Sequence, residues 1–225
     1  MLYAFVISFI LIMIGELADK SQLLALVLAT RYKVRHVILG IFVATFAVHF
    51  VSTGFGMLAG GLIPEGVLPW VSGILFLGFG VWTLRGDRVD EQDADAGSGA
   101  RFGPVIAVAV AFFFAELGDK TQIMTIAIAA DPGGALLDTL RGSGEAIRSF
   151  LSAVGIDDAG GLSQAGRFWG VTLGSTLGMV LADALAIAVG ALLGKRLPER
   201  LLTRISGVAF ILFGIFTIVA PYLIG

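Results

Sequence analysis

Cysteine is absent from this 225-residue chain, and charged residues make up only 14% of it. Without cysteine the chain can form no disulfide, no iron–sulfur cluster and no thiolate metal site. The charged fraction lies far below the ~25% of ordinary soluble domains. A net charge of -2 and the lack of a basic patch give no reason to expect nucleic acid as a partner. Because 57% of the residues are hydrophobic, we predict an all-α integral membrane protein embedded in a lipid bilayer.

Six apolar stretches are long enough to cross the ~30 Å core of a bilayer as helices. The first has neither a positive n-region nor a small-residue cleavage site, so we expect a spanning helix rather than a signal peptide. The first and fourth stretches would be about 43 Å long if straight, which predicts a tilt or a break. The six stretches are residues 2–30, 37–62, 67–85, 102–130, 168–194 and 201–223.

The chain contains a long internal repeat. The segment Glu-Leu-Ala-Asp-Lys-Ser-Gln at residues 16–22 returns as Glu-Leu-Gly-Asp-Lys-Thr-Gln at residues 116–122. Beyond it, the two halves align at an offset of 134 residues, so that Gly40 meets Gly174. Three spans per half is an odd number, which predicts that the halves enter the membrane in opposite directions. Such inverted-topology repeats are typical of secondary transporters.

The domain organisation follows from this repeat. We expect a first three-helix repeat at residues 1–85 and a second at residues 102–225. The acidic, Gly- and Ser-containing segment 86–101 is predicted to be a cytoplasmic tether rather than a cation site, because it lacks the fixed spacing of a calcium loop. Residues 131–166 form an extra-cytoplasmic insert whose apolar stripe predicts a helix packed against the bundle or lying on the membrane surface.

Glycine is concentrated in the second and fifth stretches. Small residues allow helices in a membrane to approach closely, so the pattern predicts tight helix packing, with sliding surfaces for alternating access as the other interpretation. The glycines are Gly54, Gly56, Gly60, Gly61, Gly170, Gly174, Gly178 and Gly190.

The loops differ in their content of lysine and arginine. Ten of these residues fall in the loops of one side and three in those of the other, and the richer side is predicted to be cytoplasmic. Both termini are therefore expected outside the cytoplasm. The ten are Arg31, Lys33, Arg35, Arg85, Arg88, Arg101, Lys195, Arg196, Arg200 and Arg204, and the three are Arg141, Arg148 and Arg167.

The repeated motif places ionisable residues within apolar runs, where they mark ion or substrate sites by default. On a continuous helix, Glu16 would lie beside Asp19, and Glu116 beside Asp119, as two pairs of oxygen ligands. The amides and the lysine and hydroxyl side chains of the motif extend these pairs as further ligands or supporting groups. They are Lys20, Ser21, Gln22, Lys120, Thr121 and Gln122.

The charges of the two motifs sum to a net negative charge that a cation can neutralise. Four carboxylates and two lysines facing each other sum to -2, which one divalent cation or two protons would neutralise. Removal from water favours the protonated carboxylate, so metal and protons would compete for the same oxygens. An oxygen donor set suits Ca²⁺ or Mn²⁺ better than Zn²⁺ or Cu⁺. Purely structural salt bridges would not require this costly duplication.

Two further ionisable residues occupy equivalent positions in the two halves. Asp183 lies deep in an apolar span, and we expect it to be a ligand or a proton carrier. His49 titrates near neutral pH in water. It is either a proton-coupling group or a structural residue bonded to a neighbour such as Thr45 or Thr53.

The paired motifs resemble the Glu-x-Gly-Asp-Lys-(Ser/Thr) signature of uncharacterised protein family 0016, the GDT-type calcium/manganese cation–proton antiporters. The resemblance covers nearly the whole chain. The second copy fits the signature fully, and the first departs from it only at Ala18. The resemblance implies six helices in inverted repeats and a metal site formed by Glu16, Asp19, Glu116 and Asp119.

The same resemblance implies the activity. Bacterial members are similar to manganese exporters, so we expect exchange of Mn²⁺, or else Ca²⁺, for H⁺ in a bacterial plasma membrane, without a prosthetic group. Two other classes remain open at this point, an intramembrane lipid-phosphate hydrolase and a divalent cation channel. The hydrolase would need arginine at the phosphate, and the buried lysines disfavour an open pore.

Overall fold

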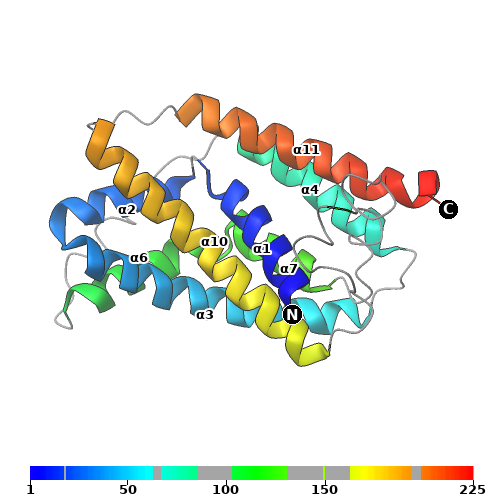
Figure 1. Ribbon diagram of the computed structural model, residues 1–225, viewed down its shortest axis with the longest axis horizontal. Helices are drawn as coiled ribbons and strands as arrows, with labels where there is room; N and C mark the ends of the chain where they lie inside the picture. The colour runs from blue at the N-terminus through cyan, green and yellow to red at the C-terminus, as the bar shows by residue number, and fades with distance from the viewer. Residues whose placement is uncertain are drawn as a thin grey trace.

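The computed structural model describes residues 1–17, 19–62, 67–85, 103–130, 149, 163–193 and 199–224 (Figure 1). Within these residues the regular structure is entirely helical, which confirms the all-α prediction. The linker at 86–101 and nearly all of the insert at 131–166 lie outside the described residues. The helices are α1 (Leu2–Gly15), α2 (Lys20–Arg31), α3 (Val34–Gly60), α4 (Leu68–Arg85), α6 (Pro104–Glu116), α7 (Lys120–Ala130), α10 (Gln164–Leu193) and α11 (Glu199–Ile224).

The first and fourth predicted spans are broken helices. Helix α1 ends at Gly15 and α2 begins at Lys20, while α6 ends at Glu116 and α7 begins at Lys120. Both breaks therefore fall within the repeated motif, which confirms the break expected from the length of these stretches. In the second copy, Gly118 adopts a φ of 84°, a left-handed conformation that glycine tolerates better than any other residue.

Two described helices satisfy the length and composition needed to cross a bilayer. They are α3 and the segment Gln164–Ala191 of α10. The first and fourth predicted spans fall short because each is interrupted, so the six-span arrangement stays a prediction.

Several predicted boundaries were wrong by a few residues. Helices α3, α10 and α11 begin earlier than expected because their first turns include polar residues, and α10 takes in the end of the predicted insert.

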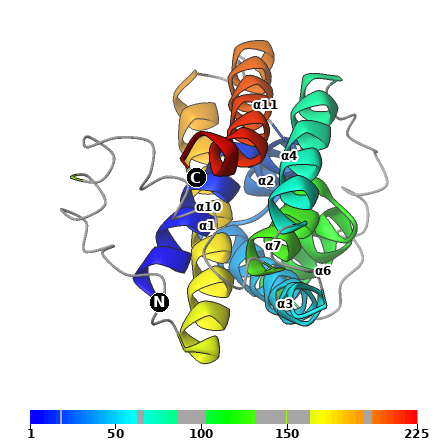
Figure 2. The ribbon, with the colours of Figure 1, turned by 90° about the vertical axis from the view of Figure 1, so that its right-hand side faces the viewer.

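The helices of one half pack mainly against those of the other half. Helix α1 packs along α10, and its counterpart α6 packs along α3; α2 contacts α10 as α7 contacts α3. The last helices of the two halves, α4 and α11, lie side by side (Figures 1 and 2). Exchanging the two halves therefore reproduces the main helix contacts, whereas the smaller contacts of α4 with α7 and of α1 with α11 have no counterpart of similar size.

Glycines at equivalent positions mark equivalent close approaches. A Cβ at Gly40 would collide with Val108 of α6, and one at Gly174 would collide with Ser8, the counterpart of Val108 in α1. A Cβ at Gly56 would meet Ile126, and one at Gly190 would meet Leu26, again counterparts. These contacts confirm the prediction of close helix packing and explain it by the lack of room for any side chain.

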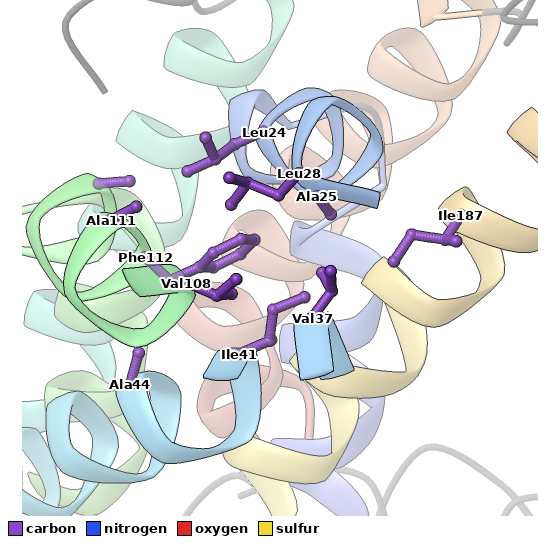
Figure 3. Packing of buried hydrophobic residues seen from close by; sticks show 11 residues of the cluster. Leu24, Ala25, Leu28, Val37, Ile41, Ala44, Val108, Ala111, Phe112 and Ile187 are labelled. Carbon is purple, nitrogen blue, oxygen red and sulfur yellow. The ribbon is translucent and has the colours of Figure 1, made fainter. Parts of the chain in front are cut away.

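The buried apolar residues of the described segments form three clusters. The largest lies among α2, the first half of α3, α6 and α10 (Figure 3). It contains Leu24, Ala25, Leu28, Val37, Ile41, Ala44, Val108, Ala111, Phe112, Ala115 and Ile187. The second joins α1, α4, α7, α10 and α11 and contains Leu11, Ile12, Phe76, Met124, Met179 and Phe210. The smallest joins α1, α7 and α10 and contains Ala4, Ala129 and Val171, with Tyr3, Met57 and Ile128 packed against it.

Candidate functional site

The two helix breaks have the same local geometry. The backbone N–H of Asp19 donates to the carbonyl of Glu16, and that of Asp119 donates to the carbonyl of Glu116, both at 3.2 Å. Each turn thus places a glutamate at the end of one short helix and an aspartate just before the next. Because the helix is interrupted there, the prediction that each pair shares one continuous helical face was wrong. Glu116 and Asp119 of the second motif nevertheless lie together, and Glu16 of the first motif joins them.

Three acids from both halves form one buried cluster. Glu16, Glu116 and Asp119 each offer one carboxylate oxygen, and these oxygens lie within 4.8 Å of one another. Their side chains are at most 4% exposed. Like-charged carboxylates this close cannot all stay ionised unless a cation or protons lie among them. The geometry therefore suits a small cation held by oxygen ligands.

A hydroxyl group supports each glutamate of the cluster in the same way. Ser21 donates to Oε2 of Glu16 at 2.5 Å, and Thr121 donates to Oε2 of Glu116 at 3.1 Å. Both hydroxyls are buried. In each glutamate the other oxygen, Oε1, is buried and accepts no hydrogen bond among the described residues. The hydroxyl thus orients the carboxylate and leaves one oxygen for a ligand.

The fourth motif acid has a different partner. Nζ of Lys120 lies 2.9 Å from Oδ2 of Asp19, and both side chains are buried. Lys120 follows Glu116 by four residues, a spacing that makes two residues neighbours on a continuous helix. The ion pair instead joins the two halves, because the breaks turn Lys120 toward the first motif. The side chain of Lys20 lies outside the described part of the structure.

The two glutamines of the motif are placed differently. Oε1 of Gln122 accepts a hydrogen bond of 2.6 Å from the backbone N–H of Gly118, which stabilises the turn before α7. Gln22 is buried at 3% exposure. A role of either amide as a metal ligand stays a prediction.

His49 contacts the second half of the chain rather than the threonines of its own helix. Its Nδ1 lies 3.0 Å from Oγ1 of Thr125 in α7. The Thr125 hydroxyl donates to the carbonyl of Thr121 at 2.9 Å, so Nδ1 carries the hydrogen and donates to Oγ1. Thr125 was not among the residues predicted from the sequence, and its counterpart in the first half is Ala25. The repeat therefore gave no signal for this contact.

Asp183 is completely buried in the middle of α10. Within the described residues neither of its carboxylate oxygens has a hydrogen-bond partner. It lies within electrostatic range of Glu16 and Glu116. Its position beside the cluster suits the predicted role as a ligand or proton carrier, which stays a prediction.

Comparison with known proteins places the chain in a family. The sequence profile described as divalent cation/proton antiporter GDT1 matches residues 4–91 and 159–223, more than half of the chain. The matched residues include the first motif and Asp183, whereas the second motif lies outside them. No solved structure gives a significant match.

Several curated relatives carry related names. A candidate manganese exporter of Vibrio cholerae is 38% identical over 131 residues, which cover 58% of this chain and 64% of that protein. The chain thus spans less than two thirds of that relative. A GDT1-like protein of Synechocystis is 31% identical over 148 residues, covering 58% and 71%. GDT1-like protein 5 of Arabidopsis thaliana is 27% identical over 166 residues, covering 58% and 73%. With its acidic cluster at two helix breaks and the profile match over most of its length, this chain belongs to the GDT1 family of divalent cation/proton antiporters.

Proposed function

We propose that this chain exchanges a divalent cation for protons across a bacterial plasma membrane, with Mn²⁺ preferred over Ca²⁺, and that it exports Mn²⁺ from the cytoplasm. One observation carries the proposal. Both halves contribute buried carboxylates to one cluster, with oxygens of Glu16, Glu116 and Asp119 within 4.8 Å of one another. The manganese preference is supported by the name of the Vibrio cholerae relative.

The chemistry of the cluster suits the exchange of a metal for protons better than metal binding alone. Carboxylates must be ionised to hold a metal, so metal binding releases protons and weakens at low pH. The same oxygens take up protons once the metal has left, because isolated charge is costly in a dry interior. A single set of ligands can therefore carry either the metal or protons. Because the metal and the protons compete for these ligands, movement of the metal in one direction is coupled to movement of protons in the other.

The broken helices suit an ion site at membrane depth. In many transporters, interrupted helices direct their ends at the substrate from the interface of two inverted repeats. The ends of α1 and α6 and the starts of α2 and α7 meet the acidic cluster here. The main helix contacts of one half have counterparts in the other half, which supports two inverted three-helix repeats, residues 1–85 and 102–225. The distribution of lysine and arginine supports termini outside the cytoplasm.

Transport by the purified protein in proteoliposomes tests the proposal. An outward-directed Mn²⁺ gradient should drive proton uptake, and an imposed pH gradient should drive Mn²⁺ against its own gradient, because one site carries both. The measurement is Mn²⁺ flux with an internal dye, with and without the pH gradient, and with Ca²⁺ as competitor. Metal flux that ignores the pH gradient would contradict exchange and indicate a channel. No flux with either ion would contradict transport.

Replacing Thr121 with Val should lower Mn²⁺ affinity about tenfold. The variant keeps the shape of the side chain but removes the hydroxyl that donates to Glu116, and a hydrogen bond to a charged group is worth about 1.5–3 kcal/mol. Thr45→Val is the matched control, because the buried Thr45 hydroxyl donates to the carbonyl of Ile41 in its own helix. Titration of Mn²⁺ by isothermal calorimetry compares the two. Equal affinities would mean that the hydroxyl does not support the site.

A further inference from the structure

A group of buried, uncharged polar side chains lies next to the acidic cluster. Its members come from the second half of α3, from α7 and from the first half of α10, and each is at most 1% exposed. None of them belongs to the repeated motif. We call this group the hydroxyl layer; it consists of His49, Thr53, Thr125, Thr172 and Ser175.

Hydrogen bonds join three helices within the hydroxyl layer and connect it to the cluster. Nδ1 of His49 lies 3.0 Å from Oγ1 of Thr125, which lies 3.4 Å from Oγ of Ser175. The Thr125 hydroxyl donates to the carbonyl of Thr121, and the hydroxyl of Thr121 donates to Glu116. The layer thus begins one helical turn from a residue that binds a carboxylate of the cluster.

Several polar atoms of the hydroxyl layer have no hydrogen-bond partner among the described residues. They are Nε2 of His49 and the hydroxyl oxygens of Thr53 and Thr172. By helical spacing, Thr53 lies on the same face as His49, and Thr172 on the same face as Ser175. Buried polar groups of this kind are usually satisfied by ordered water, which bonds to several polar partners at once. The hydroxyl layer therefore suits a chain of bound water molecules.

The corresponding positions of the other half are apolar. Three of these counterparts belong to the largest apolar cluster (Figure 3). The pairs are Thr125 with Ala25, Ser175 with Ile41, Thr53 with Ile187 and Thr172 with Ile38. The other half thus packs its helices at these positions without hydroxyls, so packing alone does not require them. Polar side chains at membrane depth are costly and mark ion or proton paths by default.

We propose that the hydroxyl layer holds water and carries protons to and from the acidic cluster, on a route that the divalent cation does not take. This inference rests on the proposed exchange function and assigns a path to one of its two ions. One proton joins the water at one end of the chain, and another leaves the other end for a carboxylate of the cluster. No side chain of the layer changes its charge in this transfer.

The composition of the hydroxyl layer favours protons over the metal. A proton passes between hydrogen-bonded oxygens, and water with hydroxyl groups provides such oxygens. A cation such as Ca²⁺ takes about six to eight oxygen ligands, with carboxylates prominent among them. The hydroxyl layer contains no carboxylate, whereas the neighbouring cluster offers three. The metal is therefore held by the cluster, and the layer serves the counter-ion.

Two transport assays in proteoliposomes separate the proton route from the metal site. Exchange of Mn²⁺ for protons under a pH gradient uses both. Exchange of internal Mn²⁺ for external radioactive Mn²⁺ at equal pH uses the metal site but moves no net proton. The variants are Thr53→Val and Thr172→Val, and the matched control is Thr217→Val, whose hydroxyl donates to the carbonyl of Phe213 in its own helix.

Thr53→Val and Thr172→Val should each slow proton-coupled exchange at least about tenfold, because positioned proton-transfer groups contribute about 10²–10⁴-fold to rates. Mn²⁺ self-exchange should keep the wild-type rate. Neither substitution removes a hydrogen bond present among the described residues, so the melting temperature should stay the same or rise. Thr217→Val should match the wild type in both transport assays. Unchanged proton-coupled exchange, or an equal loss in both assays, would overturn the proton route.

Thr125 provides an independent variant should either of the first two fail to fold. Thr125→Val should also lower proton-coupled exchange and spare self-exchange, whereas Thr125→Ser retains the hydroxyl and should restore coupling. Loss of coupling in both Thr125 variants would contradict a role of the hydroxyl. Wild-type protein that exchanges Mn²⁺ without response to a pH gradient would contradict the proposed function, and the proton route with it. Normal wild-type coupling with unaffected variants would overturn the proton route alone.

Discussion

Glu116→Gln is expected to reduce proton-coupled Mn²⁺ exchange at least about 100-fold. The change removes one charge from the cluster of Glu16, Glu116 and Asp119, and it places an amide where a carboxylate oxygen faces the other acids. Loss of a group that merely orients a metal ligand already lowers metal affinity or activity about 10–100-fold. Loss of a ligand itself should lower them at least as much. Mn²⁺ efflux from proteoliposomes under a fixed pH gradient measures the effect.

The comparison variant for Glu116→Gln is Glu199→Gln. It makes the same chemical change at the first residue of α11, which does not belong to the repeated motif, and should transport like the wild type. Glu16→Gln, the equivalent change in the first half, should be as damaging as Glu116→Gln because both glutamates contribute to the cluster. Wild-type efflux in a folded Glu116→Gln variant would show that the cluster is not the transport site.

Gly174→Ala is expected to destabilise the protein by about 1–3 kcal/mol, the range for overpacking a tight contact. A Cβ at this position would collide with the backbone carbonyl of Phe5 and the hydroxyl of Ser8 in α1. A backbone atom cannot move aside as a flexible side chain can, so α1 would have to shift away from α10. Because α1 leads into the first motif, transport should fall as well. Thermal unfolding in detergent micelles measures the loss of stability.

Gly78→Ala provides the control for this helix substitution. A Cβ at Gly78 would meet nothing within 4 Å, and alanine favours a helix over glycine by up to about 1 kcal/mol. The melting temperature should therefore stay the same or rise slightly. A Gly174→Ala variant that melts like Gly78→Ala would mean that α1 and α10 are not in close contact.

Much of the fold could be predicted from the sequence because helix packing in a membrane leaves local signals. The long apolar stretches predicted helices, and the excess length of the first and fourth predicted a tilt or a break, of which the structure shows the break. Paired glycines such as Gly56 and Gly190 predicted close contacts, and the structure confirms them with counterpart residues. The boundaries of α3, α10 and α11 were less predictable, because polar residues in a first turn give no apolar signal.

The candidate site was only partly predictable for a different reason. The motif identifies which residues carry charge, but the sequence spacing suggested a continuous helix that the structure does not contain. Lys120 of the second motif binds Asp19 of the first. For His49, Thr45 and Thr53 were named as partners under the structural alternative, but its contact is with Thr125. Both contacts join residues far apart in the chain, so the local spacing could not predict them.

The sequence alone was sufficient to predict that the chain is helical and apolar, that it is duplicated, and that each half carries the same two acids and lysine within an apolar stretch. Those properties follow from composition, periodicity and repetition, which are local or directly comparable along the chain. The three-dimensional structure was needed to show that Glu16, Glu116 and Asp119 gather and that Lys120 binds Asp19. Both contacts join the two halves, and they arise because the packed bundle brings both motifs to one site. Like charges cannot all stay ionised at that site without a cation or protons.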